Sequence, residues 1–309
     1  MKKIWHPNLK IGAFLYTISI FFYLLFNKKF DLIYSRFLHG CYVSILLKNK
    51  VIFESHNPIV NNKNHKLMIF KRLIKSKYFE KLVVISQALK NIYLENGYLN
   101  DMKIQVAHDG ADEVKEFNRK AKLLGCKDNL KVGYVGHMYK GKGMEVISSI
   151  AEKLEDDVDL HIIGGLENDI EKWKSKIVSK NVYFYGFISH KNVSNYINAL
   201  DICLLPNQKI VHANSSGASS FNENISTFTS PLKLFEYMSH KKAIIASDLP
   251  VIREVLNEKN SILVESDNID MWISVIKKLK NIKNRQLIEN QALNDFLKYT
   301  WKNRASLVV

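Results

Sequence analysis

The sequence has 309 residues, long enough for two cores of ordinary size, and 47% of them are hydrophobic. The sequence has 45 Lys and Arg residues against 30 Asp and Glu residues, which gives a formal net charge of +15. It contains no recognised nucleic-acid-binding module and no interleaved pattern of basic and aromatic residues, so nucleic-acid binding is not expected. The ten histidines form no cluster at metal-ligand spacing, so no zinc site is expected. Three dispersed cysteines predict reduced thiols in a cytoplasm.

The first element is the apolar run from Ile11 to Phe26, which covers 16 residues. A helix that spans a membrane needs about 20 residues, and no small-residue cleavage site follows the run, so a signal peptide is not expected. The run is typical of a helix buried between a sheet and its neighbours. A helix that dips into a membrane surface and a spanning helix are the alternatives.

Positive charge is concentrated in the first part of the chain. Residues 1–125 hold 21 Lys and Arg against 9 Asp and Glu, whereas residues 126–309 hold 24 against 21. The stretch from Lys63 to Lys81 has seven basic residues and one acidic residue, with apolar residues at near-helical spacing. It predicts a basic amphipathic helix that contacts anionic lipid head groups. A solvated cationic face above a buried stripe is the alternative.

The strand-like run from Lys50 to Ser55 ends at His56, just before Asn57 and Pro58. In α/β sheets, strand ends at this edge are where ligands meet catalytic side chains. His56 is therefore the candidate catalytic residue of the first part of the chain, with an ordinary turn residue as the alternative.

The second part of the chain alternates strands and helices. Lys131 to Gly143 forms a strand followed by a loop with three glycines and two lysines, which opens a helix; such glycines let a backbone approach phosphate. The further strand-like runs, with the turn that follows the last of them, are residues 159–165, 182–188, 201–206 and 243–250. This alternation predicts a parallel, doubly wound sheet.

The segment from Ser230 to Met238 reads Ser-Pro-Leu-Lys-Leu-Phe-Glu-Tyr-Met. Pro231 suits the first turn of a helix, and the free N–H groups around Ser230 to Lys233, with the charge of Lys233, suit a phosphate. Glu236 lies on the same helix face and can accept hydrogen bonds from ligand hydroxyls. The arrangement fits a nucleotide diphosphate with its ribose; an ordinary surface helix is the alternative.

This segment resembles the donor-binding segment of the retaining family-4 (group 1) glycosyltransferases. The spacing Gly136-x5-Lys142-Gly143 resembles the family's phosphate loop, with His137 where the family has Arg. Residues 108–112 resemble the family's Asn-Gly-Val-Asp turn, and residues 299–305 its closing helix. Phe228 stands where many members have the first of two glutamates, so the sugar must be recognised differently, by backbone groups near Thr229 and Ser230 or by the loop before them.

The resemblance implies an α/β GT-B architecture: two Rossmann-like domains with parallel sheets facing a cleft. Residues 1–125 would be the acceptor-side domain, 126–290 the nucleotide-sugar domain and 291–309 a helix that crosses back to the first domain. The first domain is expected to be incomplete, lacking its first one or two βα units. The polar loop of residues 207–229, Ser-rich at its middle, would be a lid or a disordered insertion.

The resemblance also implies a site and a reaction. The implied catalytic residues are His56, Lys142, Lys233 and Glu236, and the implied donor-binding residues are Gly136, His137, Gly143, Ile188, Thr229, Ser230, Pro231 and Leu232. A sugar would pass with retention from a nucleotide-diphosphate donor to a hydroxyl of a saccharide or lipid-linked acceptor. Protein cations stabilise the leaving diphosphate, so neither a metal nor a cofactor is expected.

The resemblance implies a role in the assembly of bacterial surface polysaccharide, lipopolysaccharide or glycolipid. The protein would work in the cytoplasm, at the inner face of the membrane, and would contact the membrane peripherally through the basic first domain. The alternative is a non-catalytic remnant or partner subunit that keeps a nucleotide-sugar site. The short first domain, His137 and Phe228 motivate this alternative.

Overall fold

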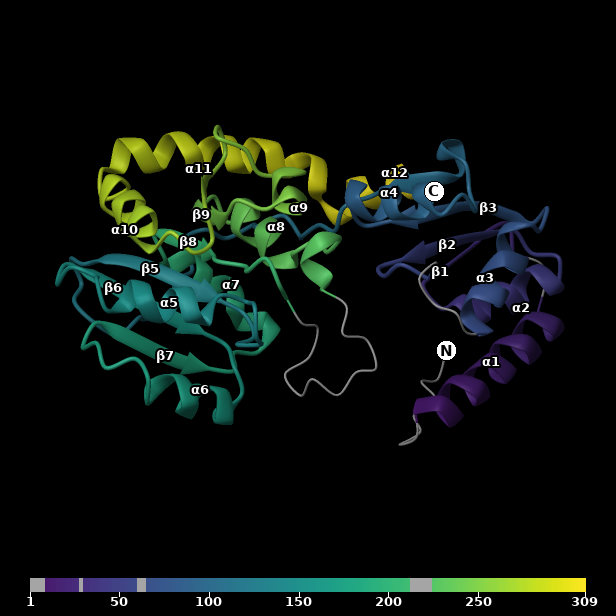
Figure 1. Ribbon diagram of the computed structural model, residues 1–309, viewed down its shortest axis with the longest axis horizontal. Coiled ribbons are helices and arrows are strands. Elements are labelled where there is room, and N and C mark those ends of the chain that lie inside the picture. The colour runs from purple at the N-terminus through teal and green to yellow at the C-terminus, as the bar shows by residue number, and fades with distance from the viewer. Residues whose placement is uncertain (1–8, 28–29, 60–64, 212–223) are drawn as a thin grey trace. The chain divides into compact units, whose positions relative to one another are not determined.

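The computed structural model describes residues 9–27, 30–59, 65–211 and 224–309. The chain divides into two compact units (Figure 1). Unit 1 contains residues 1–107 and Val308, and unit 2 contains residues 108–307 and Val309. Each unit is built on its own parallel sheet, so the predicted α/β class with two parallel sheets is confirmed.

Unit 1 has a sheet of order β1-β2-β3-β4 in which every pair is parallel. Its strands are β1 (Ile33–Ser35), β2 (Val51–Ser55), β3 (Phe79–Val84) and β4 (Ile104–Val106). Its helices are α1 (Leu9–Phe26), α2 (Leu38–Leu46), α3 (His65–Ile74), α4 (Gln87–Glu95) and the 3-10 turn η1 (Asp101–Lys103). All five residues of β2 are buried, as expected for a parallel strand with both faces covered.

The apolar run at the start of the chain forms α1, but the interpretation of this helix as buried is wrong. No residue between Ile11 and Phe26 is buried, and Phe26 is 79% exposed. α1 packs against α2, with the rings of Tyr16 and Phe37 5.4 Å apart. Its outer side has no such neighbour among the described residues. No helix in the described part of the chain has the length and apolar character that crossing a membrane requires.

The predicted long basic helix is also shorter than expected. Its helical part is α3, which ends at Ile74; Lys81 lies in β3, and Lys63 lies outside the described residues. The chain turns at Ser76, whose N–H donates to the Leu73 carbonyl. Phe79 then pairs with β2, so the sheet ladder, a contact remote in sequence, overrides the local helical spacing.

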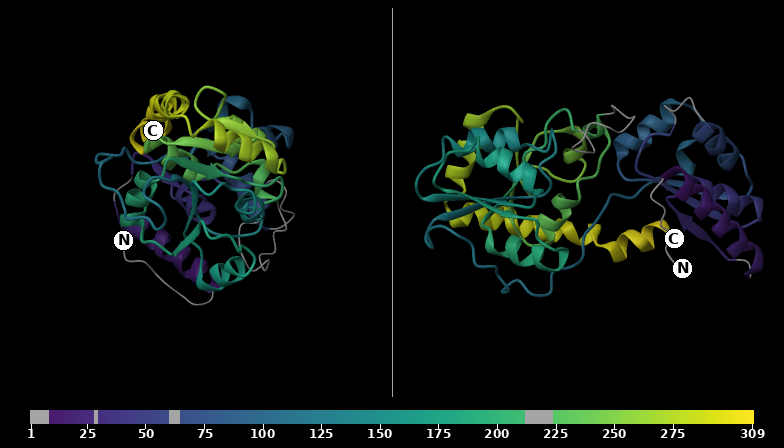
Figure 2. Two further views of the ribbon diagram at one scale, coloured as in Figure 1. Left: turned by 90° about the vertical axis from the view of Figure 1, so that its left-hand side faces the viewer. Right: turned by 90° about the horizontal axis from the view of Figure 1, so that it is seen from below.

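Unit 2 has a six-stranded sheet of order β10-β9-β8-β5-β6-β7, again with only parallel pairs. Its strands are β5 (Leu130–Val135), β6 (Val158–Ile163), β7 (Val182–Gly186), β8 (Ile202–Leu205), β9 (Ala243–Ser247) and β10 (Ile262–Val264). Its helices are α5 (Met144–Ala151), α6 (Glu167–Lys174), α7 (His190–Ala199), α8 (Leu232–Ser239), α9 (Pro250–Arg253), α10 (Ile269–Lys278), α11 (Ile282–Phe296) and α12 (Trp301–Val308), with 3-10 turns η2 (Ile225–Thr227) and η3 (Leu297–Tyr299). Figure 2 shows α11 as one long helix along this unit, where it packs against α8 and β9.

The strand order places a switch point between β5 and β8. The chain runs from β5 outward to β6 and β7, and returns through α7 to β8 on the other side of β5. In doubly wound sheets the loops that leave such neighbouring strands diverge and open a crevice at the carboxyl edge. The loop after β5 and residues 206–211, which follow β8, both lie at this edge.

The units divide at Ala107 and His108, rather than near Gly125 as the sequence suggested. The polar stretch before Gly125 belongs to unit 2 because it is bonded there: Ala111 pairs with Thr300, and the Leu124 N–H donates to the Tyr185 hydroxyl. Residues 291–309 also belong to unit 2, except Val308, which clusters with apolar residues of unit 1.

Candidate functional site

The glycine loop after β5 has the predicted form of strand, loop and helix. Gly141 and Gly143 have φ of 85° and 96°, which favours glycine. A Cβ on Gly143 would lie 2.1 Å from the Pro206 carbonyl oxygen, and one on Gly141 would lie 2.1 Å from that of Ile210. These glycines therefore let the loop lie directly against the segment that follows β8.

Lys142 stands between these two glycines and is partly buried. Burial lowers the pKa of its ammonium. Within the described ranges, no hydrogen bond or ion pair of its side chain is found. A partly desolvated cation without an anion is costly, so this position favours an anionic ligand.

His137 replaces the expected Arg and lies on the exposed side of the same loop. Its ring stacks on Tyr139, with centroids 4.8 Å apart and planes 2° apart. The Tyr134 hydroxyl donates to the His137 carbonyl at 2.5 Å, which fixes the backbone just after Gly136. The loop is thus held by stacking and a buried hydroxyl.

Helix α8 begins at Leu232, and Pro231 is its N-cap rather than a residue of its first turn. The residues before it are bonded within the protein: the Thr229 N–H donates to the Ile225 carbonyl at 2.9 Å, and the Ser230 hydroxyl accepts from the Asp109 N–H at 3.2 Å. The Thr229 amide is thus already engaged, and Phe228 is buried. Residues 207–229 were expected to form either a lid or a disordered insertion, and their Ser-rich middle lies within residues 212–223, outside the described residues.

Lys233 and Glu236 are paired with each other on α8. Nζ of Lys233 lies 2.5 Å from Oε2 of Glu236, and their side chains are 28% and 20% exposed. Both residues stand close to the helix start, as predicted. The charge of Lys233 is therefore engaged, in contrast to that of Lys142.

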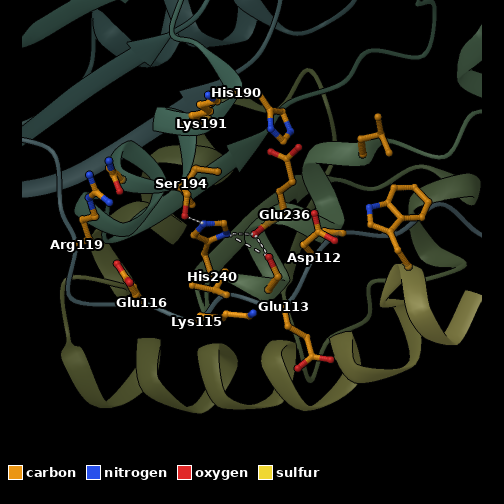
Figure 3. Close-up of a pocket in the computed structure, with 18 of the residues that line it drawn as sticks. Asp112, Glu113, Lys115, Glu116, Arg119, His190, Lys191, Ser194, Glu236 and His240 are labelled. Atoms are coloured by element: carbon orange, nitrogen blue, oxygen red, sulfur yellow. Dashed lines mark hydrogen bonds between the residues drawn. The ribbon is translucent and has the colours of Figure 1, made fainter.

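A cavity of about 440 Å³ lies beside Glu236 (Figure 3). It is formed by one face of α8, the first turns of α7 and the segment of residues 110–119. His190, at the start of α7, points its ring toward the Glu236 carboxylate in Figure 3. Charged side chains of both signs surround the cavity, namely Asp112, Glu113, Lys115, Glu116, Arg119, Lys191 and Glu236.

The cavity also contains a serine and histidine pair. Nδ1 of His240 lies 2.6 Å from the Glu236 carbonyl, which can only accept, so Nδ1 carries the proton. Nε2 then accepts from the Ser194 hydroxyl at 2.7 Å. Burial lowers the pKa of His240, which keeps the ring neutral. Sequence reasoning missed this pair because 46 residues separate its members.

Two predicted site residues lie elsewhere. Ile188 follows β7 and is partly buried. His56 follows β2 in unit 1 and pairs through Nε2 with Glu54, whose side chain is 4% exposed. Lys233 and Glu236 therefore lie together near the start of α8 in unit 2, whereas His56 lies in unit 1. The catalytic role of His56 stays a prediction.

Comparisons with known proteins show which family and which folds the chain resembles. Residues 129–281 match the family described as Glycosyl transferases group 1. An uncharacterized glycosyltransferase of Methanocaldococcus jannaschii is 27% identical over 296 residues, which cover 92% of this chain and 68% of that protein. Anabaena HepE, solved with UDP and glucose, has a TM-score of 0.67 at 15% identity over 96% of this chain and 78% of its own. The lipopolysaccharide outer core galactosyltransferase WaaB has a TM-score of 0.66 at 16% identity, over 96% and 79%. The expected GT-B fold is thereby confirmed.

Proposed function

Because residues 129–281 match the group 1 glycosyltransferases and the chain has the GT-B fold, we propose that this protein transfers a sugar from a nucleotide-diphosphate donor to an acceptor hydroxyl. The donor diphosphate binds at the loop after β5, and its ribose binds at α8. The observation that carries this proposal is Lys142, a partly buried cation with a lowered pKa and no partner among the described residues. A diphosphate would supply the missing anion.

Donor binding would also change the pair on α8. Lys233 and Glu236 neutralise each other without ligand. When the diphosphate arrives, Lys233 turns toward it, and Glu236 is released to accept hydrogen bonds from the ribose hydroxyls. Charge develops on the diphosphate as the glycosidic bond breaks, and the two lysines stabilise that charge. Retention of stereochemistry and independence of metal ions are part of the proposal.

The donor and the pathway are proposed from the similar proteins. HepE was solved with UDP and glucose, which makes a uridine diphosphate hexose the first donor to test. WaaB is a lipopolysaccharide galactosyltransferase, which supports assembly of a surface polysaccharide or glycolipid as the setting.

Isothermal calorimetry on the full chain tests the donor site. UDP should bind, and Lys142→Met should weaken binding by about 10- to 100-fold, the worth of a charge-assisted contact. Lys140→Met is the matched control, because Lys140 is an exposed lysine of the same loop. Equal affinities of the wild type and Lys142→Met, or no binding of UDP, GDP or ADP, would overturn the assignment.

A second comparison isolates the ribose contact. Glu236→Gln should weaken the binding of UDP about 10-fold. It should leave the affinity for 2′,3′-dideoxy-UDP unchanged, since this analogue lacks the hydroxyls that donate hydrogen bonds to Glu236. An equal loss for both ligands would show that Glu236 acts only through Lys233.

A further inference from the structure

A continuous apolar stripe covers the outer side of α1. Its members are Ile11, Phe14, Leu15, Ile18, Phe22, Leu25 and Phe26. At 100° per residue these positions fall within about 120° of the helix circumference. Their exposed fractions run from 37% for Ile18 to 79% for Phe26. The stripe contains no charged residue and runs from Ile11 to Phe26, the last residue of the helix.

This concentration is unusual within the described part of the chain. With Tyr23, eight of the exposed large apolar side chains lie on this one helix, whereas the others are spread over many elements. Single exposed apolar residues are normal, but a contiguous patch marks an interaction surface. α1 cannot turn the stripe inward, because its other side already packs against α2 through Tyr16 and Ile20, which approach Phe37 and Gly40.

The charges around the stripe indicate what covers it. In sequence, Lys10 immediately precedes the stripe, Lys28 and Lys29 follow it, and the first acidic residue is Asp31. Residues 1–107 hold 17 Lys and Arg against 5 Asp and Glu. An apolar surface on a unit of strongly positive net charge is complementary to an anionic lipid surface. A second copy of this chain would bring the same cations face to face, which disfavours self-association.

We propose that α1 is an interfacial helix that binds unit 1 to an anionic phospholipid bilayer. The helix lies in the plane of the membrane and its phenylalanines enter the boundary between head groups and acyl chains. The net positive charge of residues 1–107 is attracted to lipid phosphates. The exposed Lys66, Arg72 and Lys75 of the α3 region add to the attraction. This surface replaces the longer basic helix predicted from the sequence, and it does not depend on the proposed sugar transfer.

Vesicle co-sedimentation of the full chain tests the proposal. The wild type should sediment with vesicles of phosphatidylcholine and phosphatidylglycerol and far less with phosphatidylcholine alone. The triple variant Phe14→Gln, Phe22→Gln, Phe26→Gln should partition at least about 10-fold more weakly. The control Val178→Gln, Leu287→Gln, Leu297→Gln removes three exposed apolar residues of unit 2 and should bind as the wild type does.

A conservative change guards against misfolding of the triple variant. Phe22→Trp should gain fluorescence that is quenched by brominated acyl chains in anionic vesicles, relative to the wild type. The proposal is overturned if the wild type does not bind anionic vesicles, if the triple variant binds equally well, or if the fluorescence gained by Phe22→Trp is not quenched. Light scattering that shows a dimer abolished by the triple variant would assign the stripe to self-association instead.

Discussion

Lys233 and Glu236 are bound to each other across one turn of α8, with Nζ and Oε2 2.5 Å apart. Lys142, the other lysine assigned to the donor diphosphate, has no such anion among the described residues. The two lysines therefore start from opposite states in the ligand-free protein. One must leave a carboxylate to reach a phosphate, and the other gains its first counter-charge.

This difference predicts opposite effects on stability. Burial lowers the pKa of Lys142, so the folded state binds its proton more weakly than the unfolded state and the charged form costs stability at pH 7. Lys142→Met should raise the free energy of unfolding by on the order of 1 kcal/mol while it weakens UDP binding. Lys233→Met should lower the free energy of unfolding by up to about 1 kcal/mol, since it removes a part-exposed ion pair. Urea unfolding at pH 7 measures both, and a destabilised Lys142→Met would contradict the prediction.

A second prediction concerns His161, which is fully buried in β6. Burial lowers its pKa to about 4, and Nε2 has no hydrogen-bond partner among the described residues. Between pH 6.5 and about 4 the folded state binds fewer protons than the unfolded state, so stability should fall by roughly 3 kcal/mol as the pH drops. His161→Phe should reduce this acid sensitivity, as followed by urea unfolding from about pH 7 to about pH 4. An unchanged pH profile in that variant would assign the acid loss to other groups.

A third prediction separates backbone strain from loop contact. Gly143→Ala places a Cβ at positive φ and against the Pro206 carbonyl, so it should destabilise unit 2 by about 3 kcal/mol or more and disturb UDP binding. Gly97→Ala is the matched control, since Gly97 has φ of 67° but open space at its Cβ; it should cost only about 1 kcal/mol. Similar losses in the two variants would mean that the loop can move away from Pro206.

A fourth prediction distinguishes an active enzyme from a remnant that only binds nucleotide. His56 lies in unit 1, whereas the proposed donor site lies in unit 2. The affinity of His56→Gln for UDP, measured by calorimetry, should therefore equal that of the wild type. The same substitution should reduce hydrolysis or transfer of the bound donor sugar by at least about 100-fold, the usual worth of a positioned acid or base. Glu95→Gln, on the exposed end of α4, is the control. If the wild type binds donor but shows no turnover with any acceptor or water, the non-catalytic alternative is favoured.

Much of the site could be predicted from local sequence because its signals are local. Gly141 and Gly143 mark backbone conformations that other residues rarely adopt, and Pro231 marks the start of α8 within one residue. Lys142 was predicted as a phosphate ligand, but the sequence could not show that its ammonium would be partly buried and without a partner among the described residues. The loop that holds Lys142 packs against the segment after β8, which is remote from it in sequence.

By itself, the sequence determined the alternation of strands and helices, the glycine loop and the segment that begins α8, because hydrophobic period and turn residues act over a few positions. The tertiary structure decided which surfaces are covered. It left the outer side of α1 exposed, ended α3 at Ile74 by pairing Phe79 with β2, and joined Ser194 to His240. The burial of a side chain and its hydrogen-bond partners depend on residues from distant parts of the chain, so no local sequence pattern predicts them.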